Sequence, residues 1–157
     1  MLSNDILRSV RYILKANNTD LARILALGNV DATPEQIAIW LRKEEEEEEG
    51  FQRCPDIVLS SFLNGLIYEK RGKDEAAPAL TAERRINNNI VLKKLRIAFS
   101  LKTDDILAIL TGQLFRVSMP EITAMMRAPD HKNFRECGDQ FMRYFLRGLA
   151  AREHAAK

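Results

Sequence analysis

The sequence contains one helical pattern twice, and this duplication limits the fold more than any other feature. Residues 4–43 align with residues 89–128, and residues 51–66 align with residues 134–149. The second pair of segments shares the pattern F-x-x-C-x-D-x(5)-F-L-x-G-L, which chance does not readily supply. The register changes where one copy has EEEEEEG and the other PDHKN, as expected for an insertion in a loop. The chain is therefore predicted to fold as two similar units.

Each copy is predicted to form four helices. Apolar residues recur at intervals of three and four, and no segment shows sustained alternation with a period of two. The third helix of each copy is predicted to start at TPEQ or SMPE, with proline near its first turn. Ser3 and Asn88 are expected to cap the first helices. The predicted fold class is all-α, with two tandem homologous four-helix units related by a pseudo-twofold axis or by tandem stacking.

The domain boundaries follow from the repeat. Residues 1–71 are predicted to form the first helical repeat and residues 86–157 the second. The stretch between them, GKDEAAPALTAERR at 72–85, is rich in Gly, Pro and small or charged residues and is predicted to be a linker. Residues 1–71 carry 9 Lys and Arg against 12 Asp and Glu, a net charge of −3, whereas residues 86–157 carry 12 against 7, a net charge of +5. The two halves are thus suited to different partners or to each other.

Composition indicates a soluble protein of the cytoplasm. The chain has 157 residues, of which 46% are hydrophobic and 29% charged, as in an ordinary globular protein. No apolar run approaches the roughly 18 residues of a membrane span, so no membrane association is expected. The N-terminus, MLSNDILRSV, interrupts with Asp and Arg the apolar stretch that a signal peptide needs.

The chain also resembles the YehS-like family of enterobacterial proteins. Four stretches carry the resemblance: LSNDILRSVRYILKAN, RCPDIVLSSFLNGLIYEKRGKDE, NNNIVLKKLRIAFSLKTDDILAIL and FRVSMPEITAMMRAPDHKNFRECGDQF. The resemblance covers nearly the whole chain and implies a twice-repeated helical domain, with no catalytic motif to carry over. The glutamate run at 44–49 is longer than expected of the family, so that loop is a poor guide to shared function.

The sequence offers few groups for catalysis or for binding a cofactor or metal. It contains no P-loop, dinucleotide fingerprint or nucleophile elbow, no C-x-x-C motif and only two histidines. Cys54 and Cys137 stand where the fourth helix of each copy begins, a position that can activate a thiol. The alternative is a small buried residue at the helix entry, and we expect both thiols to be buried and unlinked.

Basic residues of the second copy form the candidate binding site. The second and third helices of each copy have the outline of a helix-turn-helix motif, which many helical hairpins share. The first copy follows that outline with six glutamates, which would repel phosphate, whereas the second copy is basic. The candidate residues for binding an anion or nucleic acid are Arg116, Arg127, Lys132, Arg135, Arg143 and Arg147.

A glycine inside the fourth helix of each copy is the candidate packing device. Glycine in a helix interior costs about 0.5–1 kcal/mol relative to alanine, so its repetition suggests close approach of another helix. That helix is expected to be the fourth helix of the other copy, and a small-molecule pocket is the alternative. The predicted packing residues are Phe62, Gly65, Leu66, Phe145, Gly148 and Leu149.

The function predicted from these features is that of a non-catalytic helical interaction module. Its expected partner is a protein that the sequence does not identify, and the pattern is compatible with a homodimer. The alternative is a nucleic-acid-binding protein that uses the basic second repeat. No cofactor is expected in either case.

Overall fold

The computed structural model describes residues 1–43 and 50–156 and contains eight helices within these ranges. They are α1 (Ser3–Leu14), α2 (Asn18–Leu27), α3 (Pro34–Trp40), α4 (Asp56–Arg71), α5 (Asn88–Ala98), α6 (Thr103–Gly112), α7 (Met119–Met125) and α8 (Asp139–Ala155). No residue in the described ranges lies in a strand. The prediction of an all-α fold with four helices per copy is therefore confirmed. The insertion predicted at the glutamate run 44–49 lies outside the described residues.

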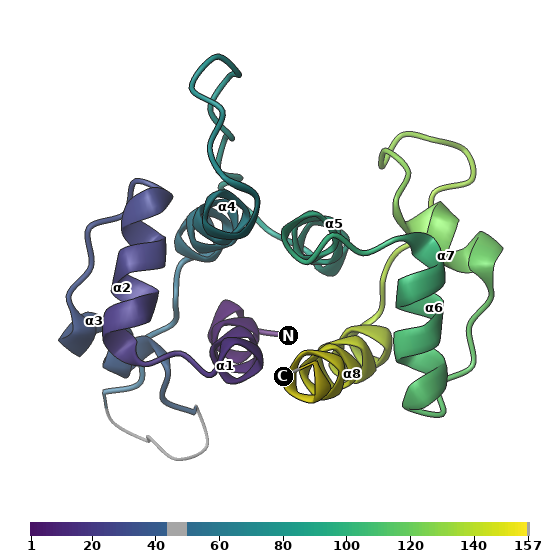
Figure 1. Ribbon diagram of the computed structural model, residues 1–157, viewed down its shortest axis with the longest axis horizontal. Helices are drawn as coiled ribbons and strands as arrows, with labels where there is room; N and C mark the ends of the chain where they lie inside the picture. The colour runs from purple at the N-terminus through teal and green to yellow at the C-terminus, as the bar shows by residue number, and fades with distance from the viewer. Residues whose placement is uncertain (44–49, 157) are drawn as a thin grey trace. The chain divides into compact units, whose positions relative to one another are not determined.

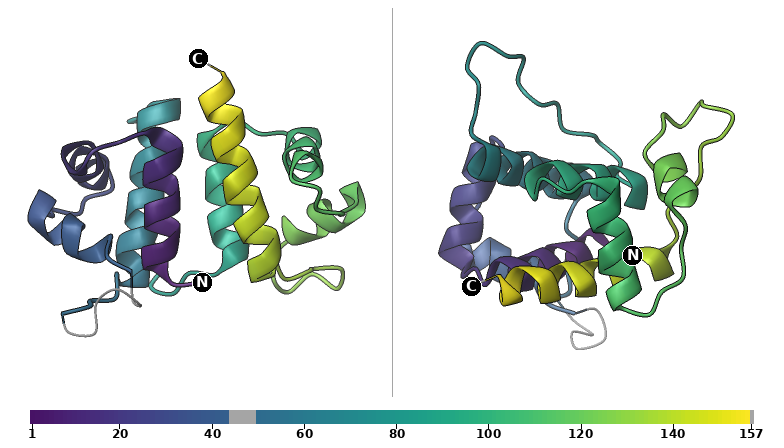
Figure 2. Two further views of the ribbon diagram at one scale, coloured as in Figure 1. Left: turned by 90° about the horizontal axis from the view of Figure 1, so that it is seen from below. Right: turned by 45° about the vertical axis from the view of Figure 1, so that its right-hand side comes forward.

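The chain divides into two compact units, Met1–Ile86 and Asn87–Lys157. In unit 1, α2 packs against α3 and α4, and α1 packs against α4 (Figure 1). In unit 2, α6 packs against α7 and α8, and α5 packs against α8 (Figure 2). The same helix pairs therefore pack together in both units, as a duplicated sequence requires.

A buried asparagine holds the start of the first helix in each unit. The side-chain amide of Asn4 donates to the carbonyl oxygens of Trp40 and Gln52, both at 2.9 Å, and its oxygen accepts the backbone N–H of Cys54 at 2.9 Å. The side chain thus uses its donors and its acceptor where water is excluded, and it fixes the end of α3 and the segment that leads into α4. In unit 2 the corresponding residue, Asn89, bonds in the same way to Met125, Arg135 and Cys137.

Ser3 and Asn88 do not cap their helices, which corrects the prediction. Each is the first residue of its helix, and its side chain instead donates to the aspartate that begins the fourth helix. The Ser3 hydroxyl donates to Asp56 at 2.9 Å, and the Asn88 amide donates to Asp139 at 2.8 Å. Asn87 caps α5, because its side-chain oxygen accepts a backbone N–H of the first turn.

The glycines of α4 and α8 lie at close helix crossings. A Cβ atom placed on Gly65 would overlap the carbonyl oxygen of Ile24 and lie 3.1 Å from the backbone nitrogen of Gly28, both in or next to α2. A Cβ atom on Gly148 would lie 2.8 Å from the carbonyl oxygen of Ile109 in α6. The helix at each glycine is therefore the second helix of the same unit. The expectation that the other copy's fourth helix lies there is wrong, because the pattern predicts a close approach without naming its partner.

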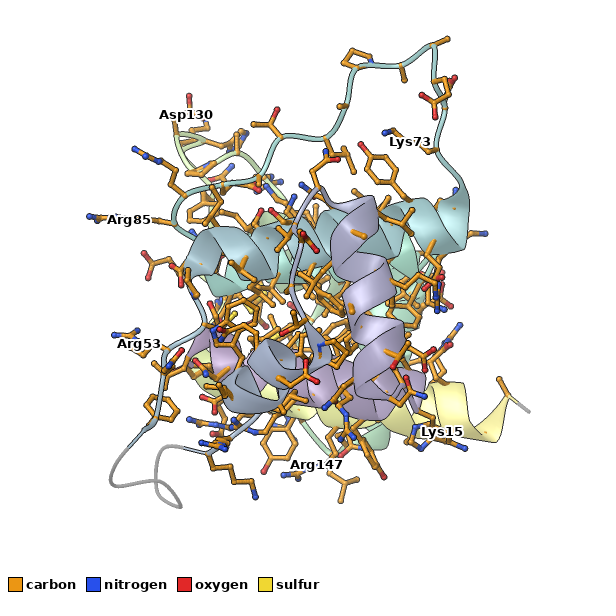
Figure 3. The ribbon with its side chains drawn as sticks, turned by 90° about the vertical axis from the view of Figure 1, so that its left-hand side faces the viewer. Lys15, Arg53, Lys73, Arg85, Asp130 and Arg147 are labelled. Atoms are coloured by element: carbon orange, nitrogen blue, oxygen red, sulfur yellow. The ribbon has the colours of Figure 1, made fainter. Side chains whose placement is uncertain are left out.

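The segment after α4 packs back onto that helix. The chain leaves α4 near Lys73 and returns over the helix to Arg85 (Figure 3). The segment runs antiparallel to the helix. The backbone N–H of Leu80 donates to the hydroxyl of Tyr68 at 2.7 Å, and the hydroxyl of Ser60 donates to the carboxylate of Glu83 at 2.8 Å. The backbone N–H of Ile86 donates to the carboxylate of Asp56 at 3.1 Å. Residues 72–86, named the return segment below, are thus part of unit 1 and not a free tether.

Candidate functional site

The six basic residues predicted to form one site fall into two groups. Arg127, Lys132 and Arg135 belong to the loop between α7 and α8, and two of them have structural partners. Arg127 donates to the carbonyl oxygen of Asn133 at 3.2 Å, and Arg135 pairs with Glu121 at 3.2 Å. These two guanidinium groups therefore help to shape the loop before any ligand is considered.

Arg143 and Arg147 form the second group, on the exposed side of α8. Helical spacing places them on one face with Gln140, Tyr144 and Ala151, and we name these five residues the basic face of α8. Both arginines are exposed, and Tyr144 is half-buried between them. The loop around Asp130 lies well away from Arg147 (Figure 3), but Arg135 at the end of that loop lines a pocket together with Gln140.

Aromatic contacts order the basic face and bring Arg116 to it. The guanidinium group of Arg147 lies 5.1 Å from the centre of the Tyr144 ring, within the range of a cation–π interaction. Phe115 also contacts that ring, with ring centres 5.4 Å apart. Arg116 follows Phe115 and lines, with Gln140, a pocket of about 190 Å³ at the start of α8. Arg116 therefore shares this pocket with Arg135 at the start of the basic face, and Arg143 and Arg147 follow along the same face of α8.

A second pocket lies at the other end of the basic face. It measures about 200 Å³ between α6 and α8, with Gly148 and Ala151 in its wall. Three of its residues, Ala108, Gly112 and Ala151, are smaller than their counterparts in unit 1, which are Arg23, Leu27 and Tyr68. Gln113, in contrast, is larger than its counterpart, Gly28.

The equivalent face of α4 in unit 1 is covered at the positions of the two arginines, whereas Ile57, the counterpart of Gln140, is 42% exposed. Ser60 and Asn64, which correspond to Arg143 and Arg147, are 0% and 3% exposed. The return segment contacts Ser60, whose hydroxyl donates to the carboxylate of Glu83 at 2.8 Å. One face of a duplicated helix is therefore neutral and buried in unit 1, whereas it is cationic and exposed in unit 2.

Leu114, which directly precedes Phe115 in the chain, was not among the residues predicted from the sequence. It is 95% exposed and adopts a φ of 59°, a left-handed conformation that a leucine seldom adopts. In unit 1 the equivalent residue is Asn29, with a φ of 66°, and asparagine tolerates this conformation. The alignment of a leucine with a turn asparagine was the available signal. A bulky apolar side chain here is unfavourable twice, in backbone strain and in exposure.

The predicted packing residues lie in the core of their units. Phe62, Leu66, Phe145 and Leu149 are each 0% exposed, and Gly65 and Gly148 are buried beside them. None of these positions opens to a ligand except Gly148, which forms part of the wall of the pocket between α6 and α8.

The two cysteines lack the surroundings of a reactive thiol. Both are buried and unpaired. Burial, with a smaller effect of Asp56, raises the pKa of the Cys54 thiol to about 12, and burial with Asp139 does the same for Cys137. The thiol at the helix entry is therefore protonated at neutral pH, which is the reverse of an activated cysteine. In the described residues no cluster of His, Cys, Asp and Glu is arranged to hold a metal ion.

Comparison with known proteins identifies the family of the chain. The model of the family described as Protein of unknown function (DUF1456) matches residues 3–72 and again residues 88–154. The chain belongs to the DUF1456 family. Its two matches correspond to the two units, so one family domain is present twice. The chain is 89% identical over 157 residues to Uncharacterized protein YehS of Escherichia coli (strain K12), covering 100% of this chain and 99% of that protein. No solved structure matches it.

Among the helices in residues 1–43 and 50–156, none has the length and apolar character needed to span a membrane.

Proposed function

We propose that this protein is a non-catalytic binding module that acts through the basic face of α8. One observation carries the proposal: the same helix face is covered in unit 1 and is exposed and cationic in unit 2. Evolution from a duplicated domain explains a shared core, but not why two buried neutral residues became exposed arginines. A surface that binds a partner accounts for both the charge and the exposure. The unpaired cysteines are in keeping with a reducing compartment such as the cytoplasm.

The proposal is tested by affinity isolation with the full-length protein. The informative variant is Arg143→Ser with Arg147→Asn, which restores the residues of unit 1 at both positions. The matched control is Arg53→Ser with Lys102→Ser, which also removes two exposed positive charges, neither of them from a candidate binding residue. We expect the wild type and the control to retain the same protein, quantified by mass spectrometry, and the arginine variant to lose it. Equal retention by all three would exclude the basic face as the binding surface.

Binding of nucleic acid is the second candidate, and one observation favours it. Arg147, Tyr144 and Phe115 form a stacked cationic and aromatic surface, which is a common way to bind single strands. The helix-turn-helix hypothesis has less support, because α3 and α7, the helices that would read bases, contain no Lys or Arg. Fluorescence anisotropy with single-stranded RNA and DNA at two salt concentrations separates the candidates. Affinity that falls steeply with salt and requires Arg143 and Arg147 would favour nucleic acid.

A further inference from the structure

We propose that the basic face of α8 binds an extended acidic polypeptide segment in which an apolar residue stands three positions before a glutamate or aspartate. This inference rests on the proposed function, because it names the partner of the same surface. Its basis is the return segment of unit 1, which shows how an extended chain lies on the equivalent helix face.

The return segment places a carboxylate at the position equivalent to Arg143. In unit 1 the hydroxyl of Ser60 donates to the carboxylate of Glu83 at 2.8 Å, and the N–H of Glu83 donates to the same hydroxyl at 3.0 Å. An arginine at this position replaces a neutral donor with a charged one that matches a carboxylate with two N–H groups. The substitution therefore converts a site that already accepts a carboxylate into a stronger one.

The charges around the basic face select a negative ligand. Arg116, Arg143 and Arg147 contribute three positive charges, and none of the five residues of the face is acidic. Three acidic residues lie near this surface: Asp139 accepts the Asn88 amide and is close enough to Arg143 for that charge to lower its pKa, Glu121 pairs with Arg135, and Glu136 lines the pocket beside Arg116. The position of Arg116 is held by an aspartate, Asp31, in unit 1. The replacements at Arg116, Arg143 and Arg147 together account for four of the eight charges by which the two copies differ.

A second contact between the return segment and α4 gives the spacing of the ligand residues. The backbone N–H of Leu80 donates to the hydroxyl of Tyr68 at 2.7 Å, three residues before the contact of Glu83 with Ser60. Ser60 and Tyr68 are eight residues apart on a helix, or about 12 Å. Three residues of extended chain span about 10 Å, which fits that separation.

In unit 2 a pocket lies at the position that is equivalent to Tyr68. Tyr68 is replaced by Ala151, which lines the pocket of about 200 Å³ between α6 and α8. A ligand whose carboxylate lies at Arg143 therefore has the residue three positions earlier near this pocket, where an apolar side chain would contact Ala108, Ile109 and Ala151. This requirement gives the ligand its apolar residue and its spacing.

The chain itself supplies the probe. Residues 74–83, DEAAPALTAE, contain the Leu80-x-x-Glu83 spacing and carry three acidic and no basic residues. A fluorescein-labelled synthetic peptide of this sequence is titrated with the full-length protein, and anisotropy is measured at low and moderate salt. The return segment of the protein is tethered beside α4 and is at high effective concentration there, so the free peptide is left to bind unit 2.

We expect saturable binding that weakens at least tenfold for Arg143→Ser with Arg147→Asn and is unchanged for Arg53→Ser with Lys102→Ser. A peptide that carries Glu83→Gln should bind several-fold more weakly, and one that carries Leu80→Ser likewise. Absence of saturable binding up to about 1 mM protein, or equal binding to the arginine variant, would overturn the inference. So would tight arginine-dependent binding of single-stranded RNA without binding of the peptide. If the peptide fails while affinity isolation still yields an arginine-dependent protein, the proposed function stands and only the ligand class is wrong.

Discussion

At the scale of single residues, the thiols show how burial sets chemistry. Cys54 and Cys137 have a pKa of about 12 because burial disfavours the thiolate. At pH 8 roughly one thiol in 10,000 is then ionised, since the pH lies about four units below the pKa. We expect iodoacetamide to label both cysteines slowly in the native protein and quickly in denaturant, as followed by mass spectrometry. Rapid labelling of either native thiol at pH 8 would revive a redox role.

Glu121 provides a titratable cap whose effect on stability has a defined sign. Its carboxylate accepts the hydroxyl of Ser118 at 2.9 Å and the backbone N–H of Ser118 at 3.2 Å, and these bonds lower its pKa from the ordinary value of 4.5. A carboxyl group with a lowered pKa in the folded state stabilises the protein above its unfolded pKa, and this contribution is lost as the pH falls through the folded value.

We therefore expect unit 2 to lose stability on acidification below about pH 4.5, and Glu121→Gln to reduce that dependence. The measurement is the urea midpoint between pH 3 and pH 7. Glu136→Gln is the matched control, because Glu136 lies in the loop that precedes α8 and does not cap a helix. An unchanged pH profile for Glu121→Gln would show that the cap does not contribute in solution.

At the scale of helices, short-range signals were sufficient for much of the fold. Thr33 and Ser118 cap α3 and α7 with proline in the first turn, as the sequence indicates, because capping depends on residues within one turn. The partner of each buried glycine was not predictable in the same way. Which helix approaches Gly65 is decided by packing between segments far apart in the sequence, and a pseudo-symmetric repeat offers two equivalent candidates.

The candidate site was predictable only in part for the same reason. The sequence indicated a basic second copy, but not that Arg127 and Arg135 are used by their own loop. Nor did it indicate that Arg116 lies at the start of the basic face, since this depends on the contact of Phe115 with Tyr144. The sequence also did not predict that residues 72–86 cover α4, because the return segment has the composition of an ordinary linker.

The close crossings predict unequal effects of alanine in the two units. At Gly65 an added Cβ overlaps the backbone of α2, which cannot move without shifting the helix. At Gly148 it meets the Ile109 carbonyl oxygen at 2.8 Å and two side-chain atoms, at 2.6 Å and 3.0 Å, which can rotate. We expect Gly65→Ala to lower the free energy of unfolding by about 1–3 kcal/mol, and Gly148→Ala to lower it by less.

Gly112 is the control for helix propensity in this series. It lies in α6, and a methyl group added there would meet no neighbouring side chain or helix within 4 Å. Gly112→Ala should therefore be neutral or stabilise by up to about 1 kcal/mol. Urea denaturation of the three variants gives the comparison. A gain in stability for Gly65→Ala would mean that the two helices cross less closely than the distances at Gly65 indicate.

At the scale of the whole molecule, the duplication kept one core and changed one surface. Both units retain the buried asparagine bonded to the backbone of the cysteine that precedes the fourth helix, and the glycine at the crossing with the second helix. They differ at the face of the fourth helix, where one unit has Ser60 and its covering segment and the other has Arg143. Conservation of internal packing with a change of surface is what gives a repeat protein a new partner without a new fold.

The return segment makes a prediction about where unit 1 ends. The repeat alone places the boundary at residue 71, whereas the compact unit extends to Ile86. A fragment of residues 1–86 keeps the bonds from the segment to Tyr68, Ser60 and Asp56, and a fragment of residues 1–71 exposes Ser60 and loses them. Each bond contributes about 0.5–1.5 kcal/mol, partly offset by the entropy of ordering the segment.

We therefore expect both fragments to be helical by circular dichroism, with the longer one more stable by at least about 1 kcal/mol in urea denaturation. Glu83→Gln in the longer fragment isolates the carboxylate and should remove part of that difference, whereas Glu75→Gln, which lies in the same segment before Leu80, should leave it unchanged. Equal stability of the two fragments would mean that residues 72–86 only connect the units. The return segment would then be no guide to a ligand of α8, so this comparison also tests the template on which the peptide proposal depends.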